Sequence, residues 1–311
     1  MISFIIIGRN EGERLRQCFH SVLHVINTDH ITEYDIVYVD SQSTDGSVEL
    51  AQSFRCIKTI LITGECNAAV ARNIGAKEAD GDILFFIDGD MEIQPGFLPT
   101  ILKSEREMIY PFISGIFIDY VYNTKQELLY KNQRIPSQDG GRYEAIVGGL
   151  FLIEKAYWVR FNGMDTRQKR SQDYDLGLRM AREGTLLFRK DQLLAKHHMV
   201  SYGMRTDNVS NIKYTALLFR KHWNNKYYIP TFVKQQYTTI LLFWSLIVAY
   251  FSWWFFCLYG VVLVYKIKKQ ISVNKIGVFT QLKSLISRDI LFYCFLLFFW
   301  PNQILEKYEI R

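Results

Sequence analysis

The sequence predicts an α/β fold, in which a mostly parallel sheet carries helices on both faces, followed by C-terminal hydrophobic membrane helices. Two observations predict the sheet: short runs rich in Ile, Val and Phe alternate with amphipathic segments over residues 2–88, and polar residues or glycine follow most runs. Strands that alternate with helices pair in parallel through right-handed crossovers. A third observation, a long apolar stretch in the last quarter of the chain, predicts the membrane helices.

The elements of the sheet follow one another closely. Strands are expected at residues 2–7, 36–39, 57–62 and 83–87, where β-branched and aromatic residues are dense. Apolar residues at helical spacing predict helices that contain residues 15–23 and 48–54, and a third helix over 67–79. Three of the strands end at Gly8, Asp40 and Asp88. Ligands collect at the carboxyl ends of strands in such sheets, so we expect the chemistry there.

Asp88 and Asp90, separated by one glycine, form the most informative pair in the sequence. Two carboxylates at the rim of a cleft suit Mg²⁺ or Mn²⁺, with the other coordination positions left to water and substrate phosphates. The alternative is a simple turn, because Asp-Gly is a common turn dipeptide.

The early segments carry a resemblance to a known family. Four pieces occur in order: SFIIIGRNE at residues 3–11, VDSQSTDGS at 39–47, ARNIG at 71–75 and DGD at 88–90. Together they resemble the family 2 glycosyltransferases of the GT-A fold, over roughly residues 1–200. The resemblance implies a nucleotide-diphospho-sugar transferase sheet and a nucleotide-sugar donor, with UDP favoured.

The resemblance also implies the residues of the donor site. It assigns donor binding to Gly8, Arg9, Glu11, Asp40, Arg72, Asp88 and Gly149. Asp40 is expected to accept a hydrogen bond from the base, unless it only caps a turn. Arg72 is expected near the diphosphate, because its planar fork suits phosphate oxygens, unless it is a solvated helix charge. Many relatives have proline and an aromatic residue near positions 7–9, and this chain departs from that pattern.

Asp173 is the expected catalytic base. It lies in the segment SQDYDLGLRMAREG at residues 171–184, which predicts a helix closed by Gly184. An inverting transfer needs one base for the proton of the acceptor hydroxyl. Relatives usually carry Glu where this chain has Gln172. Helix capping is the alternative role of Asp173, and Asp175 is the second candidate for the base.

One histidine is expected to complete the metal site. Relatives often supply a histidine ligand near the position of His197 and His198. Because neighbouring strand residues face opposite sides, only one of the two can face the cleft, and His198 is the choice. Otherwise both are ordinary surface residues. The polar, tyrosine-rich residues 119–143 predict either an acceptor-binding lid or a surface excursion.

The C-terminal residues predict membrane association. We expect a catalytic domain at residues 1–215 and a membrane-association region at 216–311, with apolar segments at about 238–265 and 285–301. Basic residues flank the first segment on both sides, which favours a hairpin or re-entrant segment over a single crossing. The expected location is the cytoplasmic face of a bacterial inner membrane, where nucleotide sugars are made.

The expected function is therefore a metal-dependent, inverting glycosyltransferase that acts on a lipid-linked or membrane-proximal glycan in surface polysaccharide assembly. One alternative is transfer to polyprenyl phosphate. An alternative of another class is a non-catalytic membrane scaffold that binds nucleotide sugars. The formal net charge of +6 requires no nucleic-acid partner, since basic residues flank the apolar stretch.

Overall fold

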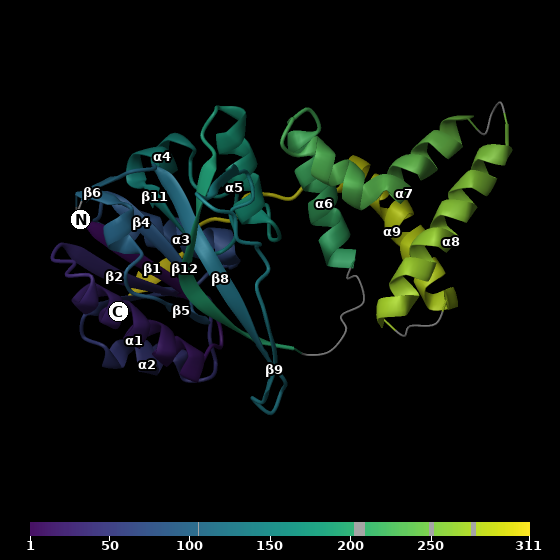
Figure 1. Ribbon diagram of the computed structural model, residues 1–311. Helices are drawn as coiled ribbons and strands as arrows, with labels where there is room; N and C mark the ends of the chain where they lie inside the picture. Colours follow the sequence, from purple (N-terminus) through teal and green to yellow (C-terminus); the bar gives the residue numbers. More distant parts are fainter. Residues whose placement is uncertain (105, 202–208, 249–251, 275–277) are drawn as a thin grey trace. The chain divides into compact units, whose positions relative to one another are not determined.

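The computed structural model describes residues 1–104, 106–201, 209–248, 252–274 and 278–311 (Figure 1). The chain divides into two compact units. Unit 1 comprises Met1–Gly203 together with Asn302–Arg311, and unit 2 comprises Met204–Pro301.

Unit 1 is built on a large mixed sheet. Along the sheet the strands stand in the order β10, β12, β8, β11, β4, β1, β2, β3 and β13, while β5 pairs with β12 and β9 with β8. The strands are β1 (Ile2–Gly8), β2 (Tyr34–Asp40), β3 (Ile57–Ile62), β4 (Ile83–Asp88), β5 (Met91–Ile93), β8 (Phe112–Tyr122), β9 (Leu128–Asn132), β10 (Arg142–Glu144), β11 (Phe151–Glu154), β12 (Leu187–Val200) and β13 (Tyr308–Ile310). A separate small ribbon joins β6 (Leu102–Ser104) and β7 (Glu107–Met108) after the 3₁₀ turn η1 (Leu98–Thr100).

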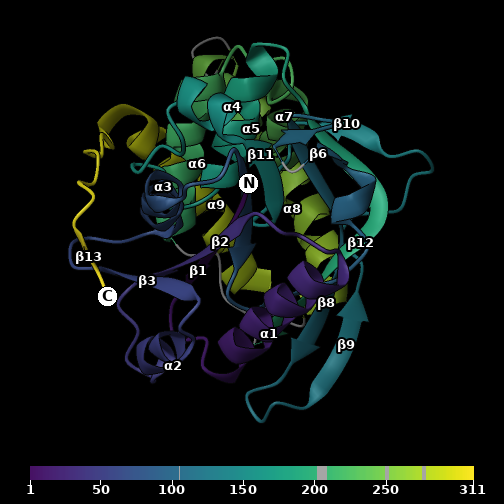
Figure 2. The same cartoon turned by 90° about the vertical axis from the view of Figure 1, so that its left-hand side faces the viewer.

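Helices cover both faces of the sheet (Figures 1 and 2). They are α1 (Glu13–Thr28) and α2 (Ser47–Ser53) on one face, and α3 (Ala68–Glu78), α4 (Lys155–Arg160) and α5 (Gln172–Arg182) on the other. Alternate residues of a strand point to opposite faces. Accordingly, Phe4 and Ile6 of β1 join the core under α1, whereas Ile5 and Ile7 join the core under α3.

The central strands fit the sequence prediction, because β1, β2, β3 and β4 pair in parallel. The sheet as a whole is mixed, since β11 runs antiparallel to β4 and β8. The sequence suggested irregular structure for residues 119–143. Instead, β8 continues to Tyr122 and returns as β9, which leaves residues 133–141 as a loop.

The C-terminal strand was not anticipated from the sequence. β13 pairs antiparallel with β3, and the hydroxyl of Tyr308 donates to Glu78 at 2.7 Å. Upstream, the backbone N–H of Ile304 donates to Thr166 Oγ1 at 2.9 Å. The last residues therefore cover an edge strand that would otherwise expose its hydrogen-bonding groups.

Unit 2 consists of helices α6 (Val209–His222), α7 (Ile229–Val248), α8 (Trp254–Asn274) and α9 (Val278–Phe298). The prediction of C-terminal membrane helices is wrong: in the ranges that the structure describes, each helix is too short or too polar to cross a bilayer. The apolar run is divided between α7 and α8, with residues 249–251 outside the described residues. Polar residues interrupt each helix, for example Lys234 in α7, Lys266 in α8 and Asp289 in α9. A crossing needs about 20 consecutive apolar residues, and none of these helices supplies them.

Candidate active site

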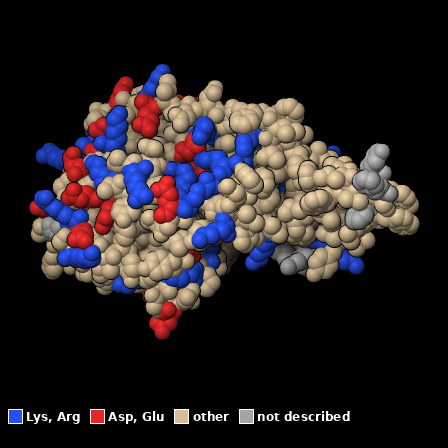
Figure 3. All heavy atoms as spheres, turned by 90° about the horizontal axis from the view of Figure 1, so that it is seen from above, with Lys and Arg blue, Asp and Glu red and all other residues tan. Residues whose placement is uncertain are grey.

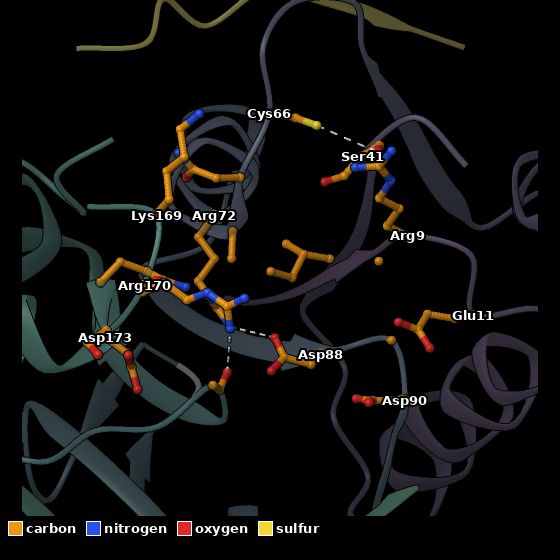
Figure 4. Close-up of a pocket in the computed structure, with 18 of the residues that line it drawn as sticks. Arg9, Glu11, Ser41, Cys66, Arg72, Asp88, Asp90, Lys169, Arg170 and Asp173 are labelled. Atoms are coloured by element: carbon orange, nitrogen blue, oxygen red, sulfur yellow. Dashed lines mark hydrogen bonds and ion pairs between the residues drawn. The ribbon is translucent and has the colours of Figure 1, made fainter. Parts of the chain in front are cut away.

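A cavity of about 680 Å³ opens at the carboxyl ends of β1 and β4 (Figure 4). It is lined by Ile7, Gly8, Arg9, Glu11, Ser41, Cys66, Asn67, Ala68, Arg72, Asp88, Gly89, Asp90, Arg134, Gly149, Lys169, Arg170, Ser171, Gln172 and Asp173. Asp173 and Arg170 lie on one side of the cavity, Asp90 and Glu11 lie on the other, and Arg72 and Asp88 lie between them. Segments from distant parts of unit 1 thus meet around one space.

Asp88 and Arg72 form an ion pair in the cavity wall. Asp88 ends β4, and its Oδ1 accepts a hydrogen bond from Nη2 of Arg72, which is almost fully buried in α3. The same Nη2 lies 3.4 Å from the carbonyl oxygen of Gly149, while the buried Nε of Arg72 has no partner among the described residues. Burial raises the pKa of Asp88, Arg72 opposes that shift, and the charge of Asp90 adds to it.

Gly149 is required to be glycine by this ion pair. A Cβ at position 149 would lie 2.0 Å from Asp88 Oδ2 and 3.1 Å from Arg72 Nη2. The segment before it is held by Arg189, which is almost fully buried in β12. Arg189 Nη2 donates to the carbonyl oxygens of Ile146 at 3.1 Å and Val147 at 2.8 Å, so this one side chain fixes the approach of the backbone to Asp88.

His197, rather than His198, contacts Asp90. Nε2 of His197 lies 3.3 Å from Asp90 Oδ2, and its Nδ1 lies 2.8 Å from Oδ1 of the buried Asp119. The expected ligand His198 points elsewhere, with Nε2 3.2 Å from Glu92 Oε2 and Nδ1 3.2 Å from the Tyr122 hydroxyl. Adjacent strand residues do face different surroundings, but the sequence pattern could not say which one reaches Asp90.

Negative charge accumulates in the corner that holds Asp90. Burial and the charge of Asp90 raise the pKa of Glu11 to about 7, and Arg14 opposes this shift. Burial lowers the pKa of His197, but its contacts with Asp90 and Asp119 outweigh that effect and raise the pKa to about 9. A bound cation would relieve the mutual repulsion of these carboxylates.

The residues present fit a metal that takes part of its coordination from a ligand. Among the described side chains, no group of three or more His, Cys, Asp or Glu is arranged to hold a metal ion. Asp90 and His197 nevertheless supply adjacent oxygen and nitrogen donors, and Asp88 lines the same cavity. Mg²⁺ and related ions often use one or two carboxylates and complete their shell with substrate phosphates. These donors therefore fit a divalent ion that is bound together with a substrate phosphate.

Asp173 lines the cavity from the first turn of α5, opposite the corner of Asp90 (Figure 4). The second candidate, Asp175, is fully buried and pairs with Arg179, whose Nε lies 3.0 Å from Asp175 Oδ2. Asp175 is therefore buried in an ion pair and does not line the cavity, whereas Asp173 does. Gln172 also lines the cavity, and its buried Oε1 has no hydrogen-bond partner within the described part of the chain.

Asp40 does not line the cavity. Its carboxylate is buried at the end of β2, where Oδ2 accepts from the Tyr38 hydroxyl at 2.8 Å and Oδ1 accepts from the backbone N–H of Ser43 at 2.7 Å. The neighbouring Ser41 lines the cavity instead. A base contact by Asp40 would require its buried carboxylate to become accessible from the cavity.

Three cationic residues of the cavity were not anticipated from the sequence: Arg134, Lys169 and Arg170. Arg134 comes from the loop at 133–141 and pairs with Asp119, with Nη2 2.9 Å from Oδ2. The basic residues just before the helix that carries Asp173 were a usable signal, because cations next to a carboxylate motif suit a phosphorylated ligand. Arg134 gave no comparable signal.

Comparison with known proteins gives the chain its family context. The family model described as Glycosyl transferase family 2 matches residues 3–161. The chain is similar to dolichol-phosphate mannosyltransferase of Saccharomyces cerevisiae, with 22% identity over 70% of this chain and 82% of the yeast protein. It is also similar to the amylovoran biosynthesis glycosyltransferase AmsB of Erwinia amylovora, with 27% identity over 63% of this chain and 70% of that protein.

The fold has counterparts among solved structures. The structure of GalNAc-T7 with UDP, GalNAc and Mn²⁺ matches with a TM-score of 0.56 and 14% identity, over 73% of this chain and 48% of that one. At this identity the likeness concerns the fold alone. The chain matches a variable part of its curated relatives, from 29% of dolichol-phosphate mannosyltransferase of Pyrococcus furiosus to 88% of a glycosyltransferase from Bacillus subtilis.

Proposed function

The chain belongs to glycosyl transferase family 2, and we propose that it moves a sugar from a nucleotide-diphosphate donor to an acceptor hydroxyl or phosphate, with inversion at the anomeric carbon. The observation that carries this proposal is the single cavity in which Arg72, Asp88 and Asp173 meet. A donor diphosphate needs cationic groups, and a transfer needs a base across the sugar from them. Both requirements are met by side chains of unit 1.

The donor is proposed to be a UDP-sugar. The named complex of GalNAc-T7 contains UDP and Mn²⁺, which supports this choice by analogy of fold. In this chain, the guanidinium of Arg72 lies at the floor of the cavity, where it can bind phosphate oxygens in addition to Asp88. Gly8, Arg9 and Glu11 line the part of the cavity nearest β1 and are proposed to border the nucleotide.

A divalent ion, Mg²⁺ or Mn²⁺, is proposed to bind at Asp88, Asp90 and His197. His197 replaces His198 in this proposal because its Nε2 lies beside Asp90. When bound, such an ion neutralises the charge that develops on the leaving diphosphate. Glu11 borders the same corner and adds to its negative potential.

The proposed transfer is a single displacement. Asp173 takes the proton from the acceptor as the acceptor oxygen bonds to the anomeric carbon. The bond from that carbon to the diphosphate oxygen breaks, and the nucleoside diphosphate leaves with the electron pair. Gln172, where relatives usually have Glu, places an uncharged amide beside the proposed base.

The acceptor is proposed to be a lipid-linked or membrane-proximal glycan of a surface polysaccharide. The name of the Erwinia relative, which refers to amylovoran biosynthesis, supports this class. Direct transfer to a polyprenyl phosphate is the second candidate, supported by the name of the yeast relative. A non-catalytic scaffold is not favoured, because the acidic residues and the cationic cavity wall are all retained.

The proposed activity can be tested with the purified full chain. We expect release of nucleoside diphosphate from one member of a panel of UDP-, GDP- and dTDP-sugars when Mn²⁺ and a lipid extract are both present. Omitting the extract should leave only slow hydrolysis, and a chelator should remove the activity. Release that is equally fast with the chelator would contradict the metal dependence.

Asp119 is expected to position His197, and its replacement with Ala should weaken Mn²⁺ binding by about 10- to 100-fold. The reason is geometric: Asp119 Oδ1 contacts Nδ1, which leaves Nε2 directed at Asp90. The measurement is the fraction of free Mn²⁺ by electron paramagnetic resonance, at a fixed concentration of UDP. This readout does not depend on turnover.

Asp139→Ala is the matched control for this variant, because Asp139 is an exposed residue of the loop at 133–141 and lies outside the cavity lining. It should leave Mn²⁺ affinity unchanged. If Asp119→Ala retained the affinity of the unmodified protein, the orientation of His197 would not depend on Asp119.

The enzyme is also proposed to work at the cytoplasmic face of a bacterial inner membrane. Exposed apolar side chains of unit 2, such as Trp253, Trp254 and Val261, stand in the same unit as exposed Lys226 and Lys268. Such a combination favours contact with an anionic lipid surface. Sedimentation with anionic vesicles tests this, and equal recovery with and without vesicles would contradict it.

A further inference from the structure

Three helices of unit 2 enclose a hollow that the proposed transfer chemistry does not use. An apolar cavity of about 340 Å³ is lined by Phe219, Trp223, Tyr228, Ile229, Phe232, Val233, Ile240, Phe243, Phe292, Tyr293 and Leu296. A smaller cavity of about 170 Å³ is lined by Asn211, Ile212, Thr215, Gln236, Arg288 and Phe292. Both are bordered by α6, α7 and α9, and Phe292 lines both, so the two cavities adjoin at this ring; together they are called the hollow.

One end of the hollow is almost purely hydrocarbon and aromatic. Trp223 is 62% exposed, Val233 47% and Phe243 44%, although all are large apolar side chains. Exposed apolar surface gathered in a concave site costs free energy in water unless something covers it. Rings of Phe219, Phe232 and Phe292 pack against one another behind it and give the site a firm floor.

The other end of the hollow carries polar groups in a fixed arrangement. Arg288 is held by the fully buried Asp289, with Nη2 2.8 Å from Oδ1, and the same Nη2 donates to Thr238 Oγ1 at 2.7 Å. Asp289 also accepts from Thr239 at 2.7 Å and from the Tyr259 hydroxyl at 3.1 Å. Both oxygens of its buried carboxylate are thus engaged, and Asp289 orients the guanidinium beside the smaller cavity.

The charge of this end is positive. Lys266 Nζ lies 3.4 Å from Thr238 Oγ1, which Arg288 also contacts, so two cations stand near the single carboxylate of Asp289. In all of unit 2, Asp289 is the one acidic residue whose side chain the structure describes, and it is buried. On the face seen in Figure 3, the charged side chains of this unit are Lys and Arg. The polar end of the hollow therefore favours an anionic ligand.

We propose that this hollow binds a lipid phosphate, with the hydrocarbon chain along the aromatic end and the phosphate at Arg288. The two cavities together fall in the range of roughly 300 to 1,000 Å³ that is usual for small-molecule sites. Arg288 can donate hydrogen bonds to phosphate oxygens, and exposed Asn211, with Thr215 and Gln236, adds polar groups around them. The lipid's role as acceptor rests on the proposed function; its binding here does not.

The test is calorimetric titration of the full chain with geranylgeranyl phosphate below its micellar concentration. Geranylgeraniol and inorganic phosphate are the two comparison ligands, because each retains only one half of the amphiphile. We expect the lipid phosphate to bind about tenfold more tightly than the alcohol, and inorganic phosphate alone to bind much more weakly than either. Equal affinity for the phosphate and the alcohol would overturn the proposal.

Variants distinguish this site from general attraction to a basic surface. Arg288→Gln should weaken lipid-phosphate binding about tenfold and leave alcohol binding unchanged, while Lys283→Gln, an exposed position on the same helix, should change neither. Asn211→Asp, which adds a charge at an exposed position of the polar end, should also weaken phosphate binding and tests the site if Arg288→Gln does not fold. Equal losses in the Lys283 and Arg288 variants would overturn the proposal.

The result is independent of glycosyl transfer, because no nucleotide sugar is present in the titration. Lipid binding without any transfer activity would leave this site standing and refute the proposed function. Transfer activity without lipid-phosphate binding at Arg288 would support the proposed function and refute this site.

Discussion

Replacing Asp173 with Asn is expected to lower the rate of sugar transfer by about 10² to 10⁴-fold, the usual contribution of a general base. The amide keeps the size of the side chain but cannot take the acceptor proton. Asp173 lines the cavity, whereas the neighbouring carboxylate on α5, Asp175, is buried in an ion pair with Arg179. Asp175 therefore cannot take the place of Asp173. The measurement is initial-rate release of nucleoside diphosphate with acceptor present.

Two comparisons make this result specific to Asp173. Donor binding by the variant should be within about twofold of the unmodified protein, because Arg72 and Asp88, the proposed donor-site residues, are unchanged. Glu183→Gln, an exposed change at the C-terminal end of the same helix, should leave the rate unchanged. Full activity of Asp173→Asn would mean that another group is the base.

Replacing Arg189 with Leu is expected to destabilise unit 1 by about 3 kcal/mol, the scale for removing one partner of a buried charge network. Besides its bonds to Ile146 and Val147, Arg189 contacts Glu144 Oε1 at 2.6 Å and donates to Ser114 Oγ at 2.8 Å. The leucine would remove the Arg189 donor from all of these acceptors, and Glu144 would keep its contact with Arg142. Urea unfolding followed by near-ultraviolet circular dichroism measures the change.

The control for Arg189 is a surface arginine given the same change. Arg160 is 58% exposed and pairs with Glu183, so Arg160→Leu should cost less than about 1 kcal/mol. Weaker donor binding should accompany the loss at Arg189, because the backbone before Gly149 is no longer held. Equal stability of the two variants would show that Arg189 adds no net stabilisation.

The sequence predicted the central strands and helices of unit 1 because the burial of their residues follows from the pattern of apolar residues close by in the chain. The run that became β4 is apolar on both faces and ends in Asp88, so the burial of this strand and the place of Asp88 at its carboxyl end follow from the local sequence. The helix carrying Asp173 was predictable from the spacing of Leu176 and Met180, which are both buried, and from Gly184, whose φ of 87° ends it. Such features depend on neighbours in the chain.

The rest depended on contacts between distant residues, which one sequence does not display. Whether His197 or His198 reaches Asp90 is decided by the register of β12 against β5 and β8. The pairing of Asp119 with Arg134 depends on how residues 133–141 fold back over β8. Apolar composition alone misled the prediction for residues 238–265, because the described part of the run belongs to two helices, α7 up to Val248 and α8 from Trp254.

The central claim is that a donor diphosphate and a divalent ion share the corner formed by Asp88 and Asp90. Calorimetric titration with UDP, in Mn²⁺ or in chelator, tests it most directly in the unmodified chain and in Asp90→Asn. Mn²⁺ should tighten UDP binding by about tenfold or more in the unmodified chain, and that gain should vanish in the variant. UDP affinity that is the same in Mn²⁺ and in chelator, or a gain that survives in Asp90→Asn, would contradict the account.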